Sequence, residues 1–329
     1  TAFTPMQISG PLAGHPLMQT ASDPDGRTVL GTLGNCAMGF TPWGTYLACE
    51  ENWNIYFHNQ DAADQAKRLS HWRYGIPAGP GGSTWQWETA DPRFDATLRA
   101  DQPHGGYVHE PHRFGWVVEI DPFDPLSPPV KRTALGRLFR ECATVTVGEA
   151  GQLAIYSGDD AKGEYIYKFV PAEKFDPAQP LRNRNLLDTG TLYVARFLPQ
   201  GQGEWKALVF GENGLTPQNG FASQAEVLLN ARAAADQVQD TPMDRPEWEA
   251  VHPRTREVYV SCTNNDARGS ADPVDAANPR ARNLHGHIVR WKEADADPAS
   301  TTFRWDLFLL AGEAENGNSG TNTGTIQGD

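Results

Sequence analysis

Three segments of this 329-residue chain share one layout, and that layout limits the folds open to it. Each segment begins with a potential metal ligand, passes a turn containing glycine or proline, and enters a short β-rich run that ends in two oxygen-bearing side chains. The leading residues are Cys36, Glu141 and Glu247, spaced 105 and 106 residues apart (36 to 141, 141 to 247). Equivalent strand pairs around one axis would bring them together, so the layout predicts a metal site and therefore an enzyme.

The side chains that end the three runs are candidate ligands for hard cations, which prefer oxygen. In chain order the pairs are Glu50 with Glu51, Asp159 with Asp160, and Asn264 with Asn265. Asp159 and Asp160 are calcium candidates, although Gly158-Asp159-Asp160 fits a solvated turn equally well. An Asx turn is the stronger interpretation of the asparagines, with a contact to substrate or metal as the alternative.

The remaining pattern predicts an all-β fold. Glycine-led runs that alternate apolar and polar residues have the period of half-buried strands, as at 115–120, 163–169, 190–197 and 285–291. The 32 glycines, 25 prolines and 10 tryptophans fit many short strands joined by turns. Repeated four-strand units with recurring glycine and aromatic residues are typical of propeller blades. An irregular β-sandwich is the alternative.

We expect residues 1–329 to form one propeller domain with two insertions. Residues 58–112 have little strand pattern, and 223–238 predict a helix with Ser223 as its N-cap. Because only about five strand units are visible, the chain is expected to end before a ring closes. The blade-like units are expected near 36–57 with 114–120, 141–169, 190–210, 245–291 and 303–310.

Composition argues against several functions. The net charge of −13 and the absence of a Lys/Arg run argue against nucleic-acid binding. No run of about 18 apolar residues exists, so no membrane span is expected. The chain starts at Thr1 without a signal peptide, which suggests a mature, exported protein whose leader has been removed.

The four cysteines predict neither a disulfide framework nor a structural zinc site, because none lies in a C-x-x-C pair. Cys49, Cys142 and Cys262 stand in apolar strand surroundings and are expected to be small buried hydrophobes. Cys36 instead begins a repeat, at the place where Glu141 and Glu247 begin the others. It is therefore the cysteine expected to bind metal.

Several longer motifs add to this pattern: residues 35–51 (NCAMGFTPWGTYLACEE), 116–122 (WVVEIDP), 133–137 (TALGR), 245–247 (RPE) and 286–291 (GHIVRW). Together they resemble the PhoX-type alkaline phosphatase family, and the resemblance covers essentially the whole chain. It implies a six-bladed β-propeller whose channel holds iron(III) and calcium and hydrolyses phosphomonoesters, in a protein that is periplasmic or secreted.

The same resemblance implies roles for individual residues. Arg245 would be the catalytic arginine that binds substrate phosphate. Asn264 is a candidate second substrate contact from its place in the third run, not from the resemblance. Cys36 would ligate iron. The resemblance would add Glu51, with Glu50 as the next candidate, Glu141 and Glu247 as metal ligands. The oxygen pair Asp159 and Asp160 completes the candidate ligands from the residue pattern alone.

The residue types agree with this chemistry. A thiolate with carboxylates suits a ferric ion, all-oxygen groups suit calcium, and such cations can clamp a phosphate. Arg245 can bind phosphate with two donors, although without the resemblance it fits a structural ion pair equally well. The expected protein is a monomer acting on small phosphomonoesters, with no nucleic-acid partner.

Two other functions fit the pattern: a calcium-dependent propeller lactonase or esterase, and a non-catalytic propeller that binds a partner. Neither needs a thiolate ligand, and a binding scaffold needs no channel arginine. Cys36 and Arg245 therefore discriminate between the three hypotheses.

Overall fold

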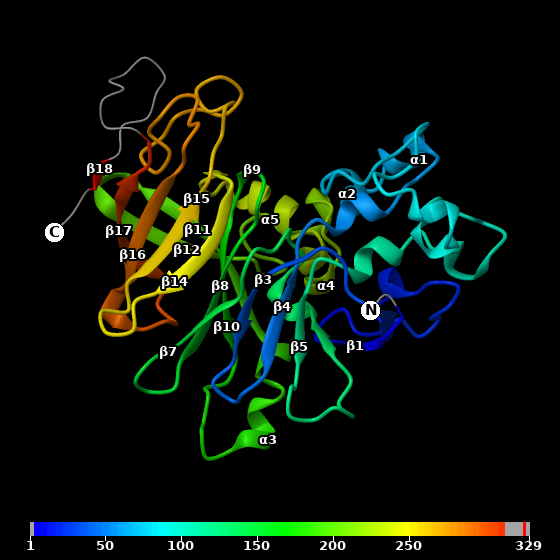
Figure 1. Cartoon of the computed structure of the whole chain (residues 1–329), viewed down its shortest axis with the longest axis horizontal. Coiled ribbons are helices and arrows are strands. Elements are labelled where there is room, and N and C mark those ends of the chain that lie inside the picture. Colours follow the sequence, from blue (N-terminus) through cyan, green and yellow to red (C-terminus); the bar gives the residue numbers. More distant parts are fainter. Residues whose placement is uncertain (1–2, 313–324, 327–329) are drawn as a thin grey trace.

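The computed structural model describes residues 3–312 and the backbone of 325–326. Its regular structure is mostly β-strand, which confirms the all-β expectation. In Figure 1, strands β14 to β17 lie at one end of the molecule (left) and the insertion 58–112 lies at the other (right, cyan). Within the described residues, no helix is long and apolar enough to cross a membrane.

The first sheet has six strands in the order β2-β1-β6-β5-β4-β3. Neighbours are antiparallel except β1 and β6, which are parallel. The bounds are β1 (Pro5–Ser9), β2 (Thr28–Leu30), β3 (Asn35–Phe40), β4 (Tyr46–Glu50), β5 (Val117–Ile120) and β6 (Val130–Arg132).

The second sheet has ten strands in the order β14-β15-β16-β17-β12-β11-β10-β8-β7, with β18 beside β17. It is nearly closed, because β7 and β14 at its two ends lie side by side. A separate two-stranded sheet pairs β9 (Lys162–Glu164) with β13 (Met243–Asp244). The bounds of the ten are β7 (Thr144–Val147), β8 (Leu153–Gly158), β10 (Ile166–Pro171), β11 (Gly190–Leu198), β12 (Gln202–Ala207), β14 (Pro246–Val251), β15 (Val258–Cys262), β16 (His287–Glu293), β17 (Thr302–Leu310) and β18 (Thr325–Ile326).

The described strands contain three antiparallel four-stranded meanders: β3-β4-β5-β6, β7-β8-β10-β11 and β14-β15-β16-β17. The expected strand pair at 190–210 is present as β11 with β12, but neither it nor 303–310 stands apart as a separate unit. Residues 190–198 form the fourth strand of the second meander, and 302–310 form the fourth strand of the third. Four-stranded meanders fit propeller blades, but this topology alone does not establish six blades, which stay a prediction.

Two glycines allow the meanders to approach closely. A Cβ atom on Gly39 of β3 would lie 1.8 Å from the carbonyl oxygen of Ala143, just before β7. A Cβ atom on Gly158 of β8 would lie 2.3 Å from the Pro246 oxygen and 2.4 Å from the Glu247 oxygen, both on β14. Side chains at these positions would push the strands apart. Glycine here therefore keeps β3, β7, β8 and β14 close together.

Two apolar cores lie beneath these strands. The larger one joins the first sheet, the insertion and the helices, and contains the buried Trp53, Trp116 and Leu229. The second fills the space between the second and third meanders and contains Tyr156 and Trp291, whose rings meet edge to face with centroids 5.5 Å apart. The nearly closed sheet thus surrounds a solid core rather than a pore.

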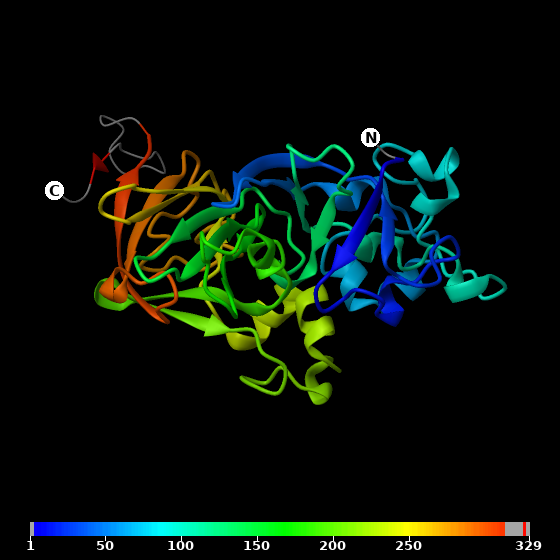
Figure 2. The ribbon, with the colours of Figure 1, turned by 90° about the horizontal axis from the view of Figure 1, so that it is seen from below.

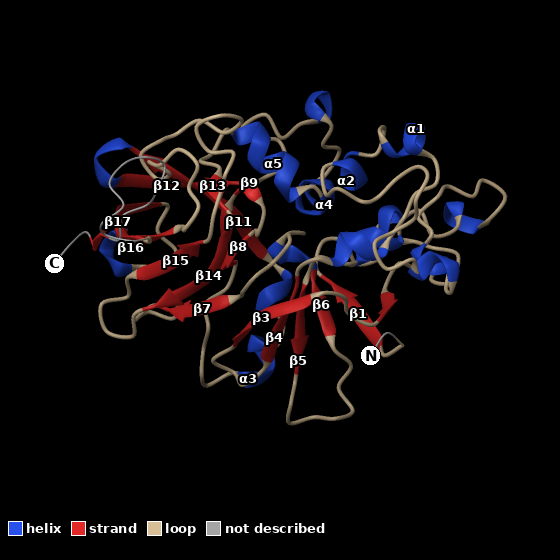
Figure 3. Cartoon of the chain, turned by 45° about the horizontal axis from the view of Figure 1, so that its top comes forward, coloured by secondary structure: helices blue, strands red, loops and turns tan. Residues whose placement is uncertain are grey.

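The helices are short. The α-helices are α1 (Ala62–Gln65), α2 (Leu69–Trp72), α3 (Pro180–Asn183), α4 (Gln224–Leu229) and α5 (Ala231–Val238). The 3-10 turns are at Pro16–Met18, Trp53–Tyr56, Trp87–Thr89, Pro92–Phe94, Pro103–Gly105, Glu110–Arg113, Thr133–Leu135, Leu186–Asp188, Pro199–Gly201, Pro217–Asn219 and Ala294–Ala296. Figure 3 shows α2, α4 and α5 along one side of the strands.

The predicted helical insertion exists, but as two helices rather than one. Ser223 is the N-cap, because its hydroxyl accepts the N–H of Glu226 at 3.2 Å. The chain breaks at Asn230, whose φ of −112° and ψ of 42° lie outside the helical region. The break turns α5 so that Ala231 and Arg232 are buried.

The long insertion 58–112 carries α1, α2 and 3-10 turns instead of strands. Its aromatic residues pack onto the first sheet's core, with the Phe94 ring 5.4 Å from that of Phe57. Figure 2 shows this segment beside the N-terminal strands, at the opposite end from β14 to β17. The insertion therefore enlarges the domain at one end and stays attached through its own apolar contacts.

Candidate metal centre

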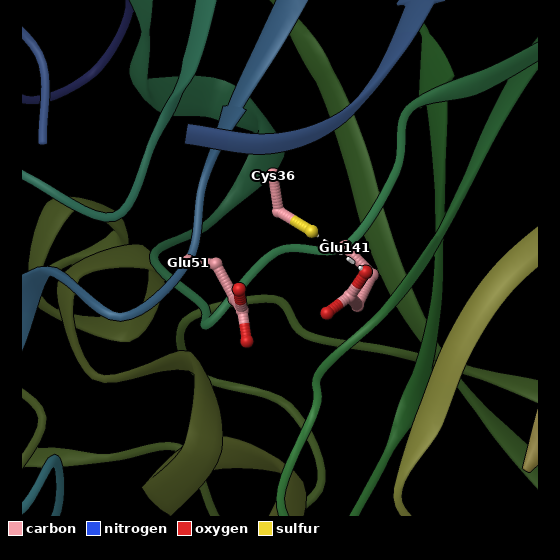
Figure 4. A group of neighbouring side chains, drawn as sticks. All are labelled: Cys36, Glu51 and Glu141. Carbon is pink, nitrogen blue, oxygen red and sulfur yellow. Dashed lines mark hydrogen bonds between the residues drawn. The ribbon is translucent and has the colours of Figure 1, made fainter. Parts of the chain in front are cut away.

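Three of the predicted ligands converge on one point. Cys36 comes from β3, Glu51 follows β4, and Glu141 precedes β7. One ligand atom from each lies within 4.8 Å of the other two, and the three side chains point toward one another (Figure 4). The Cys36 Sγ donates a hydrogen bond to Glu141 Oε2 at 3.1 Å. Among the described residues, the cluster thus joins two of the three leading residues with one carboxylate from the end of the first run. Glu247, the third leading residue, is not part of it.

Backbone hydrogen bonds hold the segments that carry these side chains. The Glu51 N–H donates to the Gly34 oxygen at 2.9 Å, and Gly34 has the positive φ of 58° that favours glycine. The Arg140 N–H donates to the Glu50 oxygen at 3.0 Å, and the Glu141 N–H donates to the Gly158 oxygen at 3.3 Å. Residues 140–141 are therefore pinned between the ends of β4 and β8.

A second group of predicted site residues surrounds Arg245. Its Nε and Nη2 donate to the two carboxylate oxygens of Asp160 at 2.9 and 2.7 Å. Its Nη1 donates to Asn264 Oδ1 at 2.9 Å, and Nη2 lies 3.3 Å from Glu247 Oε1. The Arg245 side chain remains about one-third exposed. The guanidinium is therefore oriented by three neighbours and still accessible to solvent.

The two groups influence each other electrostatically. Burial, then the charges of Glu141 and Asp160, raises the pKa of Glu51 to about 7. Burial and Asp160 also raise the pKa of Glu141, although its hydrogen bond with Cys36 opposes the shift. Burial and Asp160 raise the pKa of Glu247 as well. A cation among these carboxylates would relieve their repulsion and favour their charged forms.

The thiol responds in the same way. Burial, followed by the hydrogen bond and charge of Glu141, raises the pKa of Cys36 to about 12. Metal ligands must lose their protons, so a bound cation would reverse this shift and favour the thiolate. The donor set of one sulfur and two carboxylates fits a ferric ion.

Two expected ligands have other partners. Glu50 is fully buried, and its carboxylate accepts the Lys131 ammonium at 2.7 Å and the N–H groups of Leu33, Gly115 and Trp116. Asp159 is also fully buried, which rules out a solvated turn. It accepts both Arg232 Nε, at 2.8 Å, and the Phe139 N–H, at 3.1 Å. The oxygens of Glu50 and Asp159 are thus bound by protein donors, and neither residue belongs to the Cys36 cluster of the described residues.

The two asparagines that end the third run, Asn264 and Asn265, also have different contacts. Asn264 contacts Arg245, as described above. Asn265 is buried, and its Oδ1 accepts the Ala267 N–H at 3.0 Å, which is the expected Asx turn. Asn264 therefore belongs with the site, and Asn265 shapes the following loop.

The three other cysteines are buried and free, as predicted. The surroundings of Cys142 were not anticipated: its thiol donates to the fully buried carboxylate of Glu249 on β14. Sequence reasoning also missed Arg232, which pairs with Asp159 from 73 residues away. A buried arginine on an alanine-rich helix was the available signal, because a cation at such a position needs an anionic partner.

Comparisons with known proteins identify the family of the chain. A family model described as "Alkaline phosphatase PhoX" matches residues 1–329. The solved structure of "Pseudomonas fluorescens PhoX in complex with vanadate, a transition state analogue" is similar, with 46% identity and a TM-score of 0.89. The similarity covers 98% of this chain and 56% of the Pseudomonas chain. Among curated proteins, no sequence matches. The chain belongs to the alkaline phosphatase PhoX family.

Proposed function

We propose that this protein hydrolyses phosphomonoesters at a metal centre formed by Cys36, Glu51 and Glu141, beside Arg245. The observation that carries the proposal is the convergence of a thiol and two carboxylates next to an oriented, accessible arginine. Membership of a phosphatase family supports it, as does the vanadate complex of the Pseudomonas relative. The chain spans 56% of that relative, so the activity is proposed for the protein to which these residues belong.

The donor types suggest how metals would distribute. Cys36, Glu51 and Glu141 would hold iron(III), because thiolate with carboxylate suits that ion. Asp160 and Glu247 offer only oxygen and would contribute to calcium sites. The chemistry that such cations supply when bound is neutralisation of the charge on phosphoryl oxygens and activation of a nucleophile.

The residues of the chain would orient the substrate. Because Asp160 and Asn264 take three N–H groups of Arg245, a phosphate oxygen could accept the remaining N–H of Nη1, and a second could accept from Nη2 if it displaced Glu247. Asn264 and Asp160 fix the plane of that guanidinium, so less conformational freedom is lost when substrate binds. The hydrogen bonds that Arg245 donates to the Asp160 carboxylate raise the pKa of the guanidinium, which keeps it cationic. Arg245 would therefore position the phosphoryl group and stabilise its negative charge.

The proposal also includes the fold, a six-bladed propeller, and the cellular location, periplasmic or secreted. The three meanders with their close-packed first strands support blades of a six-bladed propeller. The family resemblance supports a periplasmic or secreted protein, and we propose that it acts as a monomer. The lactonase and the binding-module hypotheses are less well supported, because neither requires the thiol at Cys36 or the oriented Arg245.

Metal analysis combined with activity assays tests the proposal. Iron and calcium are measured in the purified protein by elemental analysis, and hydrolysis of p-nitrophenyl phosphate is assayed before and after chelation. We expect both metals to be present, activity to disappear on chelation, and both ions together to restore it. Calcium alone with lactone hydrolysis, or phosphatase activity that survives complete metal removal, would contradict the proposal.

A further inference from the structure

Arg232, at the start of α5, forms a buried ion pair with Asp159, which is adjacent in sequence to Asp160 of the candidate site. Its guanidinium donates to both carboxylate oxygens of Asp159, with Nε to Oδ2 at 2.8 Å. The side chains of both residues are almost completely buried, at 4% and 0% exposure. The guanidinium also lies over the Phe139 ring, 3.9 Å from its centroid. Arg232 thus contacts both partners of a short backbone pairing.

That pairing joins the two segments that carry Glu141 and Asp160. Asp159 Oδ1 accepts the Phe139 N–H at 3.1 Å, and the Asp160 N–H donates to the Phe139 oxygen at 3.0 Å. The Glu141 N–H donates to the Gly158 oxygen on the same pair of segments. A shift of the Asp159 carboxylate would therefore move both site carboxylates relative to each other.

Arg232 is held in turn by a larger network. Its Nε lies 3.5 Å from Glu164 Oε2 on β9. Glu164 also accepts Arg73 from the long insertion, and Arg73 Nε donates to Asp236 of α5 at 2.7 Å. This network attaches both insertions to the end of β8. Within it, Arg73 contacts Glu164 and Asp236, whereas Arg232 contacts Asp159 directly.

We propose that Arg232 is a positioning residue for the metal centre. Through Asp159, it fixes the spacing between Glu141, which completes the Cys36 cluster, and Asp160, which orients Arg245. This inference rests on the proposed function and deepens it, because it assigns the helical insertion a role in metal retention. Groups that orient metal ligands typically change metal affinity or activity about 10- to 100-fold when they are altered.

The test compares two arginine-to-lysine variants of the same network. Arg232→Lys keeps the positive charge but loses the two-pronged contact with Asp159. Arg73→Lys is the control: it makes the same change at an arginine of this network that does not contact Asp159. Both variants are purified with their metals and dialysed against graded chelator, and iron per chain and the visible absorption band are measured. We expect Arg232→Lys to lose iron at about 10- to 100-fold lower chelator concentration, with an altered band.

Arg73→Lys should match the wild-type protein in iron retention and in the visible absorption band. We expect this even if both variants have a lower melting temperature than the wild type. Equal iron retention and unchanged spectra in both variants would overturn the inference. If Arg232→Lys is not recovered folded, Asp159→Asn replaces it, since the amide oxygen still accepts the Phe139 N–H. It should show the same iron loss, and wild-type retention would overturn the inference. Wild-type protein without iron would be a different result, because it would overturn the proposed function itself.

Discussion

At the scale of single residues, neighbouring carboxylates in this protein have different tasks. Successive side chains at a strand end point to opposite sides, so one of each pair faces the interior. Glu50 is buried against Lys131, while Glu51 joins the Cys36 cluster. The second meander repeats the division, because Asp159 is buried against Arg232 and Asp160 pairs with Arg245. A buried cation thus fixes the first carboxylate of each pair and leaves the second for the site.

This division predicts opposite effects for Glu50→Gln and Glu51→Gln. Glu50→Gln leaves the fully buried Lys131 without its counter-charge and should lower the free energy of unfolding by about 3–5 kcal/mol. Glu51→Gln should change stability by less than about 0.5 kcal/mol but lower the bound iron. Urea unfolding with chelator present isolates the fold's own stability, and elemental analysis reports the iron.

The reverse pattern would contradict the assignment. Iron loss with normal stability in Glu50→Gln, or wild-type iron in Glu51→Gln, would show that the two glutamates have been assigned the wrong roles.

The sequence predicts the members of the cluster but not the choice within each pair. Cys36, Glu51 and Glu141 could be found because each stands at a fixed place before or after a β-rich run. Glu50 and Asp159 could not be separated from their neighbours. The cations that bury them, Lys131 and Arg232, lie 81 and 73 residues away and leave no local signal. Burial decided these roles, and burial depends on tertiary contacts.

At the scale of elements, the close approach of strands determines the site. Gly158 ends β8 against the Pro246 and Glu247 carbonyls of β14, and Gly39 lies against Ala143. The sequence showed glycines near strands but could not show which ones face another strand. For the same reason, the fourth strands of the second and third meanders were expected as separate units. Strand pairing across loops is not encoded in local periodicity.

Gly158→Ala tests this element-level contact. The added Cβ has no room beside Pro246 and Glu247, so β14 must move away from β8. We expect a loss of about 1–3 kcal/mol in the free energy of unfolding, together with weaker iron retention. Gly211→Ala is the control: it has a φ of 90° but nothing within 4 Å of its Cβ.

The control should lose about 1–2 kcal/mol through backbone strain alone and keep its iron. Iron retention in Gly158→Ala that equals that of Gly211→Ala would mean that the distance between β8 and β14 does not govern the site.

At the scale of the whole molecule, three meanders and two insertions serve one centre. The first strands of the meanders lie side by side, β3 with β7 and β7 with β14, and they or their flanking residues carry Cys36, Glu141 and Glu247, which are spread across 211 residues (36 to 247). The helical insertion contacts Asp159, beside the centre, through Arg232, and the long insertion is joined to that helix through Arg73 and Asp236. The all-β architecture was predictable from strand periodicity and turn residues. The nearly closed ten-stranded sheet was not, because it depends on β12 joining β11 to β17.

The central claim is that the Cys36 thiol ligates the metal on which phosphatase activity depends. Its most direct test compares Cys36→Ala with Cys49→Ala, measuring iron per chain and p-nitrophenyl phosphate hydrolysis in each purified protein. Cys49 is a fully buried core residue, so its variant controls for the loss of a thiol. We predict that Cys36→Ala loses iron and activity together, by at least about tenfold, while Cys49→Ala keeps both. Full iron content and full activity in Cys36→Ala would contradict the account.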